Sequence, residues 1–163
     1  MSKTNIRSDF PILATSSRGK PLTYLDNAAT TQKPQCVIDT IGDYYATFNA
    51  NVHRAAHEMA EKATAELERT RESCAKFLNA KSTNEIIFTK GTTESINLVA
   101  NSVPLFSEKR RNIVISELEH HSNIVPWQLV AERHNLGVAA IGISDDGELD
   151  LNQARSLINE DTA

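Results

Sequence analysis

The stretch EIIFTKGTTESINLVANS, residues 85–102, contains a short β-rich run, a glycine turn and a helical pattern in direct succession. Glu85–Thr89 predicts a strand because isoleucine, phenylalanine and threonine dominate it, and Thr92–Val103 predicts a helix. The same order returns further along the chain, where strands are expected at Asn112–Ser116 and Val138–Ile143 with a helix between them. Strands that alternate with helices favour a parallel α/β sheet.

The helix between the last two predicted strands is expected to start at a Ser122 cap and to stop at Gly137. A turn is expected at residues 146–147. Asp150 predicts the cap of a final helix, and Gln153, three residues later, would complete a capping box. No further strand is predicted before the sequence stops, so the outer faces and edges of such a sheet would be poorly covered.

Before residue 85 the sequence predicts mainly helices and loops. Leu22–Leu25 predicts a short strand after a turn at residues 18–21, and Pro34 suits the first turn of a helix that reaches about Thr47. The clearest helix is expected over residues 56–79, because apolar residues recur there at steps of three and four. Its apolar face consists of Met59, Ala63, Leu67, Thr70, Cys74 and Phe77.

The composition is that of a soluble globular protein of about one domain: 163 residues, 40% hydrophobic and 23% charged. A net charge of −4 argues against general nucleic-acid binding, which needs a basic surface. No apolar run is long enough for a membrane span, and no signal core precedes Phe10, so we expect a cytoplasmic protein without a membrane partner. Cys36 and Cys74 fit no CxxC pattern and are expected to be reduced packing residues.

Lys90-Gly91-Thr92-Thr93-Glu94 lies where the first predicted strand turns into a helix. In a parallel α/β sheet, ligands bind at the carboxyl ends of the strands. A helix start offers backbone N–H groups and the positive end of the helix dipole, and both suit a phosphate. A glycine turn followed by a threonine cap explains the same five residues equally well.

Glu119-His120-His121-Ser122-Asn123 follows the predicted strand at residues 112–116, so it is expected on the same rim as the glycine turn. A histidine here can stack on a planar cofactor or transfer protons near neutral pH. The alternative is structural: one of the paired histidines simply hydrogen-bonds backbone at a helix start.

Two further segments carry candidate site residues. His53 and His57 are four residues apart, but no third metal ligand is evident and Arg54 adds a cation, so no metal site is predicted. His53 and Arg54 are better suited to an anion. Asn27-Ala28-Ala29 lies in a loop of small and polar residues, which lets the backbone approach a ligand or another surface.

In order and spacing, these segments resemble one family. The sequences YLDNAATTQKP (24–34), NVHRAAHEMA (51–60), FTKGTTESINLVANS (88–102) and ELEHHSNIVPWQ (117–128) are similar to the group II, SUF-type cysteine desulfurases. These enzymes belong to the class V aminotransferase group and have the fold type I architecture of pyridoxal-phosphate (PLP) enzymes. The resemblance runs from about Phe10 to Ala163.

The resemblance implies an α/β fold, an incomplete fold type I large domain with a parallel sheet and helical crossovers, preceded by an N-terminal helical segment. Residues 1–55 would belong with the small domain and the active-site loops, and residues 56–163 would form the first part of the PLP-binding large domain. In this fold the strands at 85–89 and 112–116 are separated by strands that the chain lacks. Unpaired buried backbone groups cost about 1–3 kcal/mol each, so we expect the isolated chain not to be a stable domain.

The resemblance also implies the site and the cofactor, pyridoxal 5'-phosphate. Gly91, Thr92 and Thr93 resemble the clasp of the cofactor phosphate. His120 resembles the histidine that stacks on the pyridine ring and assists proton transfer, which makes it the candidate catalytic residue.

Substrate binding is implied for two loops. Asn27, Ala28 and Ala29 resemble the segment that closes over bound substrate. His53 and Arg54 resemble an active-site loop that reaches towards the neighbouring subunit of a homodimer.

The implied reaction converts L-cysteine to L-alanine and leaves a persulfide on the enzyme, from which a SUF-type acceptor protein takes sulfur for iron–sulfur cluster assembly. The lysine that binds the cofactor, the aspartate at the pyridine nitrogen, the arginine for the substrate carboxylate and the persulfide cysteine have no match in this sequence. We therefore expect no turnover by the chain alone. The alternatives are a non-catalytic interaction or dimerisation module and a small phosphate-binding α/β domain.

Overall fold

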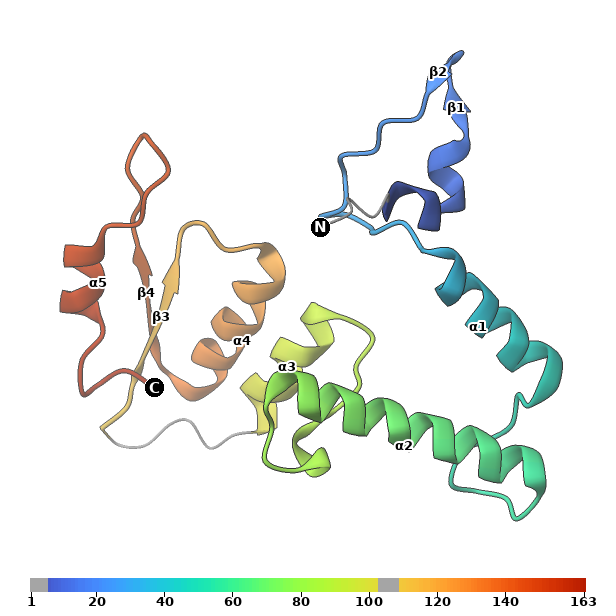
Figure 1. Cartoon of the computed structure of the whole chain (residues 1–163). Coiled ribbons are helices and arrows are strands. Elements are labelled where there is room, and N and C mark those ends of the chain that lie inside the picture. The colour runs from blue at the N-terminus through green and yellow to red at the C-terminus, as the bar shows by residue number, and fades with distance from the viewer. Residues whose placement is uncertain (1–5, 103–108) are drawn as a thin grey trace. The chain divides into compact units, whose positions relative to one another are not determined.

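The computed structural model describes residues 6–102 and 109–163. The chain forms two compact units, Met1–Ile86 and Ile87–Ala163, which are drawn in Figure 1. The elements of the first unit are η1 (Ile6–Asp9), η2 (Pro11–Ala14), β1 (Ser16–Ser17), β2 (Lys20–Pro21), α1 (Gln35–Thr47), α2 (Glu58–Leu78) and η3 (Thr83–Glu85). Those of the second are α3 (Thr92–Ser102), β3 (Asn112–Ser116), η4 (His121–Asn123), α4 (Val125–His134), β4 (Gly137–Ile141) and α5 (Leu151–Leu157).

A tight hairpin opens the first unit. Arg18 and Gly19 join β1 to β2 with φ angles of 53° and 74°, and two positive φ angles in succession match the right-handed twist of an antiparallel pair. The predicted turn is confirmed, but the strand expected at Leu22–Leu25 is wrong. The pairing ends with Leu22, whose N–H donates to the Thr15 carbonyl, and the residues after it have no ladder partner within the described chain.

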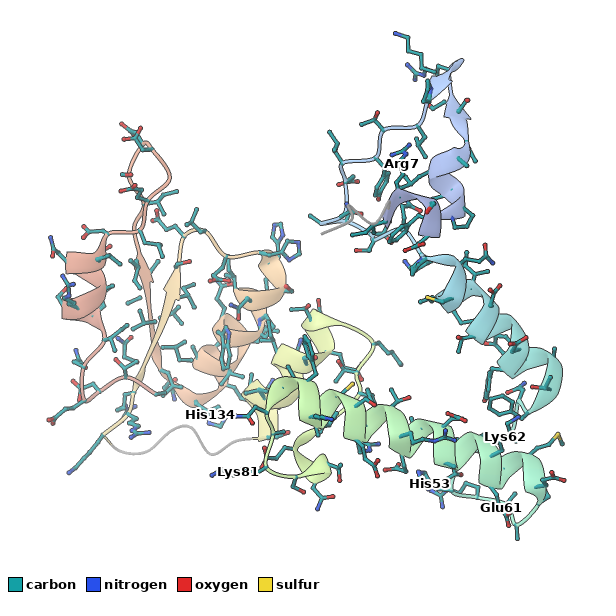
Figure 2. All side chains as sticks on the ribbon, viewed as in Figure 1. Arg7, His53, Glu61, Lys62, Lys81 and His134 are labelled. Carbon is teal, nitrogen blue, oxygen red and sulfur yellow. The ribbon has the colours of Figure 1, made fainter. Side chains whose placement is uncertain are left out.

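Arg7 ties this amino-terminal segment together. Its guanidinium donates to the carbonyls of Leu13 and Leu22, both at 2.8 Å. Figure 2 shows Arg7 pointing into the loop formed by η1, η2 and the chain after β2. One side chain thereby joins the carbonyl of Leu13, in η2, to that of Leu22, just after β2.

The two long helices of the first unit begin and end within two residues of their predicted bounds. α1 begins directly after Pro34, and α2 ends at Asn79, whose left-handed conformation (φ 55°) stops the helix. The predicted apolar face of α2 is only partly correct, because the buried residues are Ala60, Ala63 and Ala75. Phe77 is 88% exposed, so its place on the predicted apolar face does not bury it.

The strand expected at Glu85–Thr89 is also not formed. Ile86 has extended backbone angles (φ −97°, ψ 115°), and the residues up to Thr89 have no ladder partner in the part of the chain that the structure describes. A strand needs a neighbour, and β3 is paired elsewhere.

The second unit has the predicted strand–helix–strand order. β3 and β4 pair in parallel from Asn112 opposite Gly137 to Ser116 opposite Ile141. Figure 1 shows α4 on one side of these strands and α5 on the other. α3 begins at Thr92 as predicted, and its expected last residue, Val103, lies outside the described residues.

The ends of α4 differ from the prediction. Ser122 lies inside η4, and the side chain that caps this turn is His120. α4 itself begins at Val125, and Asn135, in the left-handed conformation, ends it before Gly137. Asn135 therefore does what the sequence had assigned to glycine, whereas no side chain caps the start of α4, because its N-cap residue is Ile124.

At α5, the predicted cap is confirmed. The Asp150 carboxylate accepts from the N–H groups of Asn152 and Gln153. Gln153 does not close the capping box, because its side-chain oxygen accepts from the Gly142 N–H instead. This glutamine links α5 to the chain that leaves β4.

β3 also receives a neighbour on its second edge. Asp161 and Ala163 exchange hydrogen bonds with Asn112, which forms a parallel bridge with Thr162. Because residues of a parallel strand alternate between the two edges, Val114 directs its N–H and C=O to the same side as Asn112. The ladder stops at Asn112 there, so this edge is paired at its start alone within the described residues.

The described residues bury few large side chains. The core consists of Ala60, Ala63, Ala75, Ala100, Ile113, Val130 and Ala131. Val130 is the largest side chain that is fully buried, whereas Leu25, Phe77 and Ile87 are 89%, 88% and 67% exposed. No helix in the described ranges has the length and apolar character to cross a bilayer.

We predict that the isolated chain binds a hydrophobic dye such as anilinonaphthalene sulfonate and melts over a broad temperature range, because so much apolar surface is exposed. Dye fluorescence and circular dichroism against temperature measure both. Phe77→Ser should lower the dye signal, and Lys81→Ser, at another exposed position, should not. A sharp cooperative melt with a strong near-ultraviolet signal and no dye binding would contradict the prediction.

Candidate functional site

The turn before α3 is held by side chains other than its threonine pair. The Glu94 carboxylate accepts from the Lys90 N–H at 2.6 Å. The hydroxyl of Ser95 lies 2.6 Å from that of Thr89 and 3.2 Å from the Gly91 carbonyl, to which it donates. Residues on both sides of Gly91 therefore fix the turn.

The hydroxyls of Thr92 and Thr93 have no hydrogen-bond partner among the described residues, and both residues are exposed. Neither threonine caps the helix through its side chain, which distinguishes this turn from a plain threonine cap. An added Cβ at Gly91 would meet no atom within 4 Å, so the space beside the turn is open. The first N–H groups of α3 and the two hydroxyls form a set of donors at the positive end of a helix of 11 residues.

His120 follows β3 and turns the chain into η4. The Ser122 N–H donates to its Nδ1 at 3.2 Å, and the Ser122 hydroxyl lies 3.0 Å from the same nitrogen. Because Nδ1 accepts, the neutral ring carries its proton on Nε2. The ring of His121 stands nearly perpendicular to it, at 86° and 5.3 Å between centroids.

Thr93 and His120 line the same open hollow in the second unit, about 270 Å³ in volume. Its other walls are Asn97, His121, Ser122, Val125, Pro126 and Leu129. The volume lies just below the range of about 300–1,000 Å³ typical of small-molecule sites. The threonine turn and the histidine loop, separate in sequence, thus share one rim, and Gly91 and Thr92 stand at the start of the helix that brings Thr93 there.

A ladder of side chains that was not expected from the sequence holds the His120 loop. Asn123 Nδ2 donates to Glu119 at 2.7 Å, and Trp127 Nε1 donates to Asn123 Oδ1 at 2.8 Å. The Ser116 hydroxyl also donates to Glu119, at 3.3 Å. The signal was present in the sequence: Glu119, Asn123 and Trp127 are four residues apart, so they lie on one face of the turns they form.

The candidate substrate residues lie in the first unit. Asn27, Ala28 and Ala29 are exposed in a turn whose ends are pinned by Tyr24. The Tyr24 hydroxyl lies 2.9 Å from the Asp26 carbonyl and 2.7 Å from the Thr30 carbonyl. No hydrogen bond among the described residues joins this turn to His53 or Arg54.

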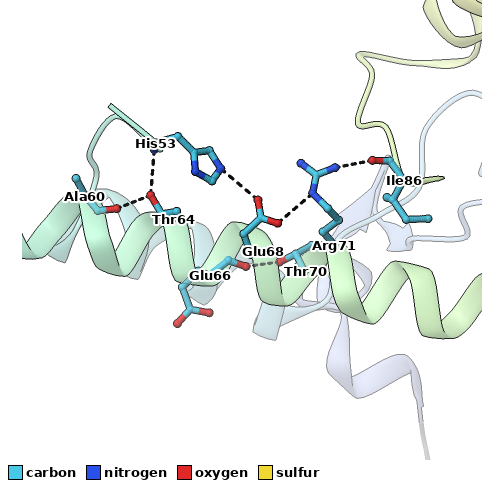
Figure 3. A network of polar contacts seen from close by, with 8 residues as sticks. All are labelled: His53, Ala60, Thr64, Glu66, Glu68, Thr70, Arg71 and Ile86. Carbon is cyan, nitrogen blue, oxygen red and sulfur yellow. Dashed lines mark hydrogen bonds and ion pairs between the residues drawn. The ribbon is translucent and has the colours of Figure 1, made fainter. Parts of the chain in front are cut away.

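His53 and Arg54 occupy an exposed loop before α2. His53 contacts Glu68 through its ring and Thr64 through its backbone (Figure 3). His57 caps α2 instead: its Nδ1 accepts a hydrogen bond from the Ala60 N–H. The two histidines therefore have separate partners, and the described residues contain no cluster of three or more metal-ligating side chains.

The cysteine prediction is half correct. Cys74 is partly buried on α2, but Cys36 is exposed on α1, so it is not the packing residue that was expected. No disulfide joins them.

Comparison with known proteins gives the family of this sequence. The family model Aminotransferase class-V matches residues 23–163. This range contains all the segments on which the resemblance was based.

Among curated proteins, a "Probable cysteine desulfurase" from Streptomyces coelicolor is 50% identical over 163 residues. A "Cysteine desulfurase" from Pectobacterium atrosepticum is 48% identical over 158 residues. Both matches cover 96% of this chain and 39% of the relative, so the chain spans well under half the length of the curated relatives it matches.

Solved structures agree. The apo structure of the cysteine desulfurase from Thermococcus onnurineus superposes with a TM-score of 0.79 at 36% identity, over 95% of this chain and 37% of that chain. A cysteine desulfurase from Escherichia coli gives a TM-score of 0.70 at 32% identity, over 94% and 38%. The expected α/β fold of this type is confirmed.

We predict that Asn123→Ala loosens the His120 loop, because it removes the bonds to both Glu119 and Trp127. Trp127 is the sole tryptophan of the chain, so its fluorescence reports the change directly. The emission should shift to longer wavelength, and acrylamide should quench it more strongly. Asn152→Ala, on α5, serves as the matched control. Equal spectra for Asn123→Ala and the unchanged chain would show that the ladder does not hold the loop.

Proposed function

Because the chain belongs to the aminotransferase class-V family, we propose that it forms the amino-terminal part of a PLP-dependent cysteine desulfurase. The whole protein would convert L-cysteine to L-alanine and retain the sulfur as a persulfide. The names and the 47–50% identity of several curated relatives support this proposal. We further propose the SUF subtype, with a sulfur-acceptor protein as partner, a homodimeric assembly and a cytoplasmic role in iron–sulfur cluster assembly.

The observation that carries the proposal is the common hollow of Thr93 and His120. A phosphorylated aromatic ring needs donors for its phosphate at one end and a flat surface for its ring nearby. The hollow is lined by Thr93, near the start of α3 with Thr92 next to it in the chain, and by the imidazole of His120. Val125, Pro126 and Leu129 give the hollow an apolar wall against which a ring could pack.

The donor set fits the phosphate group. The dipole of α3 and the N–H groups of its first turn favour a dianion, and the hydroxyls of Thr92 and Thr93 add donors that no described residue uses. The Glu94 carboxylate in this turn is negative and would repel a phosphate. Its bond to the Lys90 N–H holds it in place. Gly91 leaves the space in which the phosphate oxygens would approach.

His120 would face the ring. Its Nδ1 is occupied by Ser122, so the imidazole orientation is fixed and Nε2 holds the proton. In this position the side chain can stack on a planar ligand and transfer a proton at Nε2. When bound, pyridoxal phosphate supplies the electron sink that weakens bonds at the amino-acid Cα, and the protein supplies orientation.

The first unit would supply the substrate-facing loops. We propose that Asn27, Ala28 and Ala29 close over bound cysteine, and that His53 and Arg54 approach its anionic groups. Arg54 is exposed and has no ion-pair partner in the described ranges. Residues 1–55 would belong with the small domain and the active-site loops, and residues 56–163 with the large domain.

We predict that the chain binds pyridoxine 5'-phosphate more tightly than pyridoxine, because the phosphate uses the donors at the start of α3. The alcohol avoids unspecific imine formation with surface lysines, and isothermal titration measures both affinities. Replacing Thr92 and Thr93 together by valine should weaken binding roughly a hundredfold or more, since each of the two hydrogen bonds to a charged group contributes about 1.5–3 kcal/mol.

The control for this titration is Thr70→Val, because the Thr70 hydroxyl donates to a carbonyl within its own helix. Equal affinity for both ligands would overturn the proposed phosphate clasp. Tight binding of nucleotides in place of pyridoxine 5'-phosphate would instead favour a general phosphate-binding domain.

We also predict that the 163 residues alone release no sulfide from L-cysteine in the presence of pyridoxal phosphate and a thiol reductant. The expected cofactor lysine and persulfide cysteine have no match in this sequence, so the ring would be held without being activated. A methylene-blue assay for sulfide tests this against pyridoxal phosphate without protein. Turnover above that background would show that the 163 residues contain a complete site.

A further inference from the structure

His53 has a backbone conformation that histidine rarely adopts. Its φ angle is 57°, in the left-handed region, which costs an ordinary residue about 1–2 kcal/mol. Such a residue keeps this conformation only where its surroundings hold it. The loop that carries it, ahead of α2, is exposed and contains no helix or strand from residue 49 to residue 57. Contacts with α2 must therefore hold it.

Two side chains of α2, one turn apart, supply these contacts (Figure 3). The backbone N–H of His53 donates to Thr64 Oγ1 at 3.1 Å, and the Thr64 hydroxyl donates in turn to the Ala60 carbonyl at 2.7 Å. The ring Nε2 of His53 lies 3.2 Å from Glu68 Oε1. Because a carboxylate only accepts, this nitrogen carries the proton. Backbone and side chain of one residue are thus both fixed.

Glu68 is itself oriented by a third residue. Its second oxygen lies 3.3 Å from Arg71 Nε, and an Arg71 terminal nitrogen donates to the carbonyl of Ile86. The Arg71 side chain is more buried than that of Glu68, at 24% against 41% exposed. The carboxylate therefore stands between a fixed guanidinium and the histidine ring, which limits the rotamers it can take.

We infer that Thr64 and Glu68 are positioning residues: they hold His53 in its left-handed conformation and thereby present Arg54, the next residue, to solvent. Arg54 has no partner in the described part of the chain, so its guanidinium remains available for an anion. That the anion is the cysteine substrate rests on the proposed function, whereas the positioning itself does not. The residues of α2 act through the loop and do not touch a ligand.

The test is limited trypsin digestion of the full chain, with cleavage after Arg54 followed by mass spectrometry. Cleavage after Arg18, in the exposed hairpin turn, serves as the internal reference. In the unchanged chain the bond after Arg54 should be cut at least several-fold more slowly than the bond after Arg18. Glu68→Ala should raise the relative rate about tenfold, as expected where cleavage follows a local opening that loses one charge-assisted hydrogen bond.

Two variants separate positioning from a general effect on the helix. Glu66→Ala is the matched control, because Glu66 lies on the same helix and pairs with Arg69. It should leave the rate unchanged. Glu68→Gln keeps an oxygen that can accept from Nε2 and should restore most of the protection.

His53→Gly gives the decisive comparison. Glycine adopts the left-handed conformation without strain but has no ring to contact Glu68. In this background Glu68→Ala should have no further effect on cleavage after Arg54, because the contact between Glu68 and the His53 ring is already absent. A helix merely destabilised by Glu68→Ala would show the same rate increase in both backgrounds.

The inference is overturned if the unchanged chain is cut after Arg54 as fast as after Arg18. It is also overturned if Glu68→Ala and Glu66→Ala behave alike, or if the His53→Gly background does not abolish the Glu68→Ala effect. The digestion needs neither cofactor nor substrate. A chain that fails to bind pyridoxine 5'-phosphate but shows these rates would therefore count against the proposed function and leave the positioning intact.

Discussion

The parallel pairing of β3 with β4 is the constraint on which the second unit depends. In a parallel pair the chain must return to the same end before it can pair again, so a helix has to cross between the strands. α4 makes this crossing, and the segment between β3 and α4 must turn at the carboxyl end of β3. That turn carries His120, and α4 packs against α3, whose first residues include Thr93. This pairing, together with the packing of α3 on α4, brings Thr93 and His120 to a common hollow.

Patterns of neighbouring residues predicted most of the helices. They could not predict which segments pair as strands. The helices α1, α2 and α3 lie within two residues of their expected starts, because periodicity and helix ends are properties of neighbouring residues. Glu85–Thr89 has the composition of a strand but remains unpaired, since a strand also needs a partner that no local pattern contains. Phe77 matched the apolar face of α2 and is exposed for a related reason. Burial depends on what covers a face, and periodicity specifies only the face.

In the candidate site, too, residue types could be predicted from the sequence but the contacts between side chains could not. Gly91, Thr93 and His120 were visible because their chemistry follows from residue type and from the ends of predicted elements. The ladder that joins Glu119 to Trp127 was harder to see, because residue types do not tell which side chains of a motif bond to one another. The contacts of His53 could not be predicted either, because no sequence pattern indicates a left-handed backbone conformation at a histidine.

The histidines show why structural and functional explanations of one residue need not compete. His57 and His120 both accept a backbone N–H on Nδ1, so each is a cap in the ordinary sense. For His120 that bond also places the proton on Nε2 and orients the ring at the edge of the hollow. A structural bond on one nitrogen therefore prepares the other for chemistry. His53 reverses the arrangement, because its Nε2 contacts a carboxylate and its backbone carries the strain. The sequence left open whether His120 binds backbone or acts in a site; its Nδ1 binds backbone, and the role proposed for it uses the other nitrogen of the same imidazole.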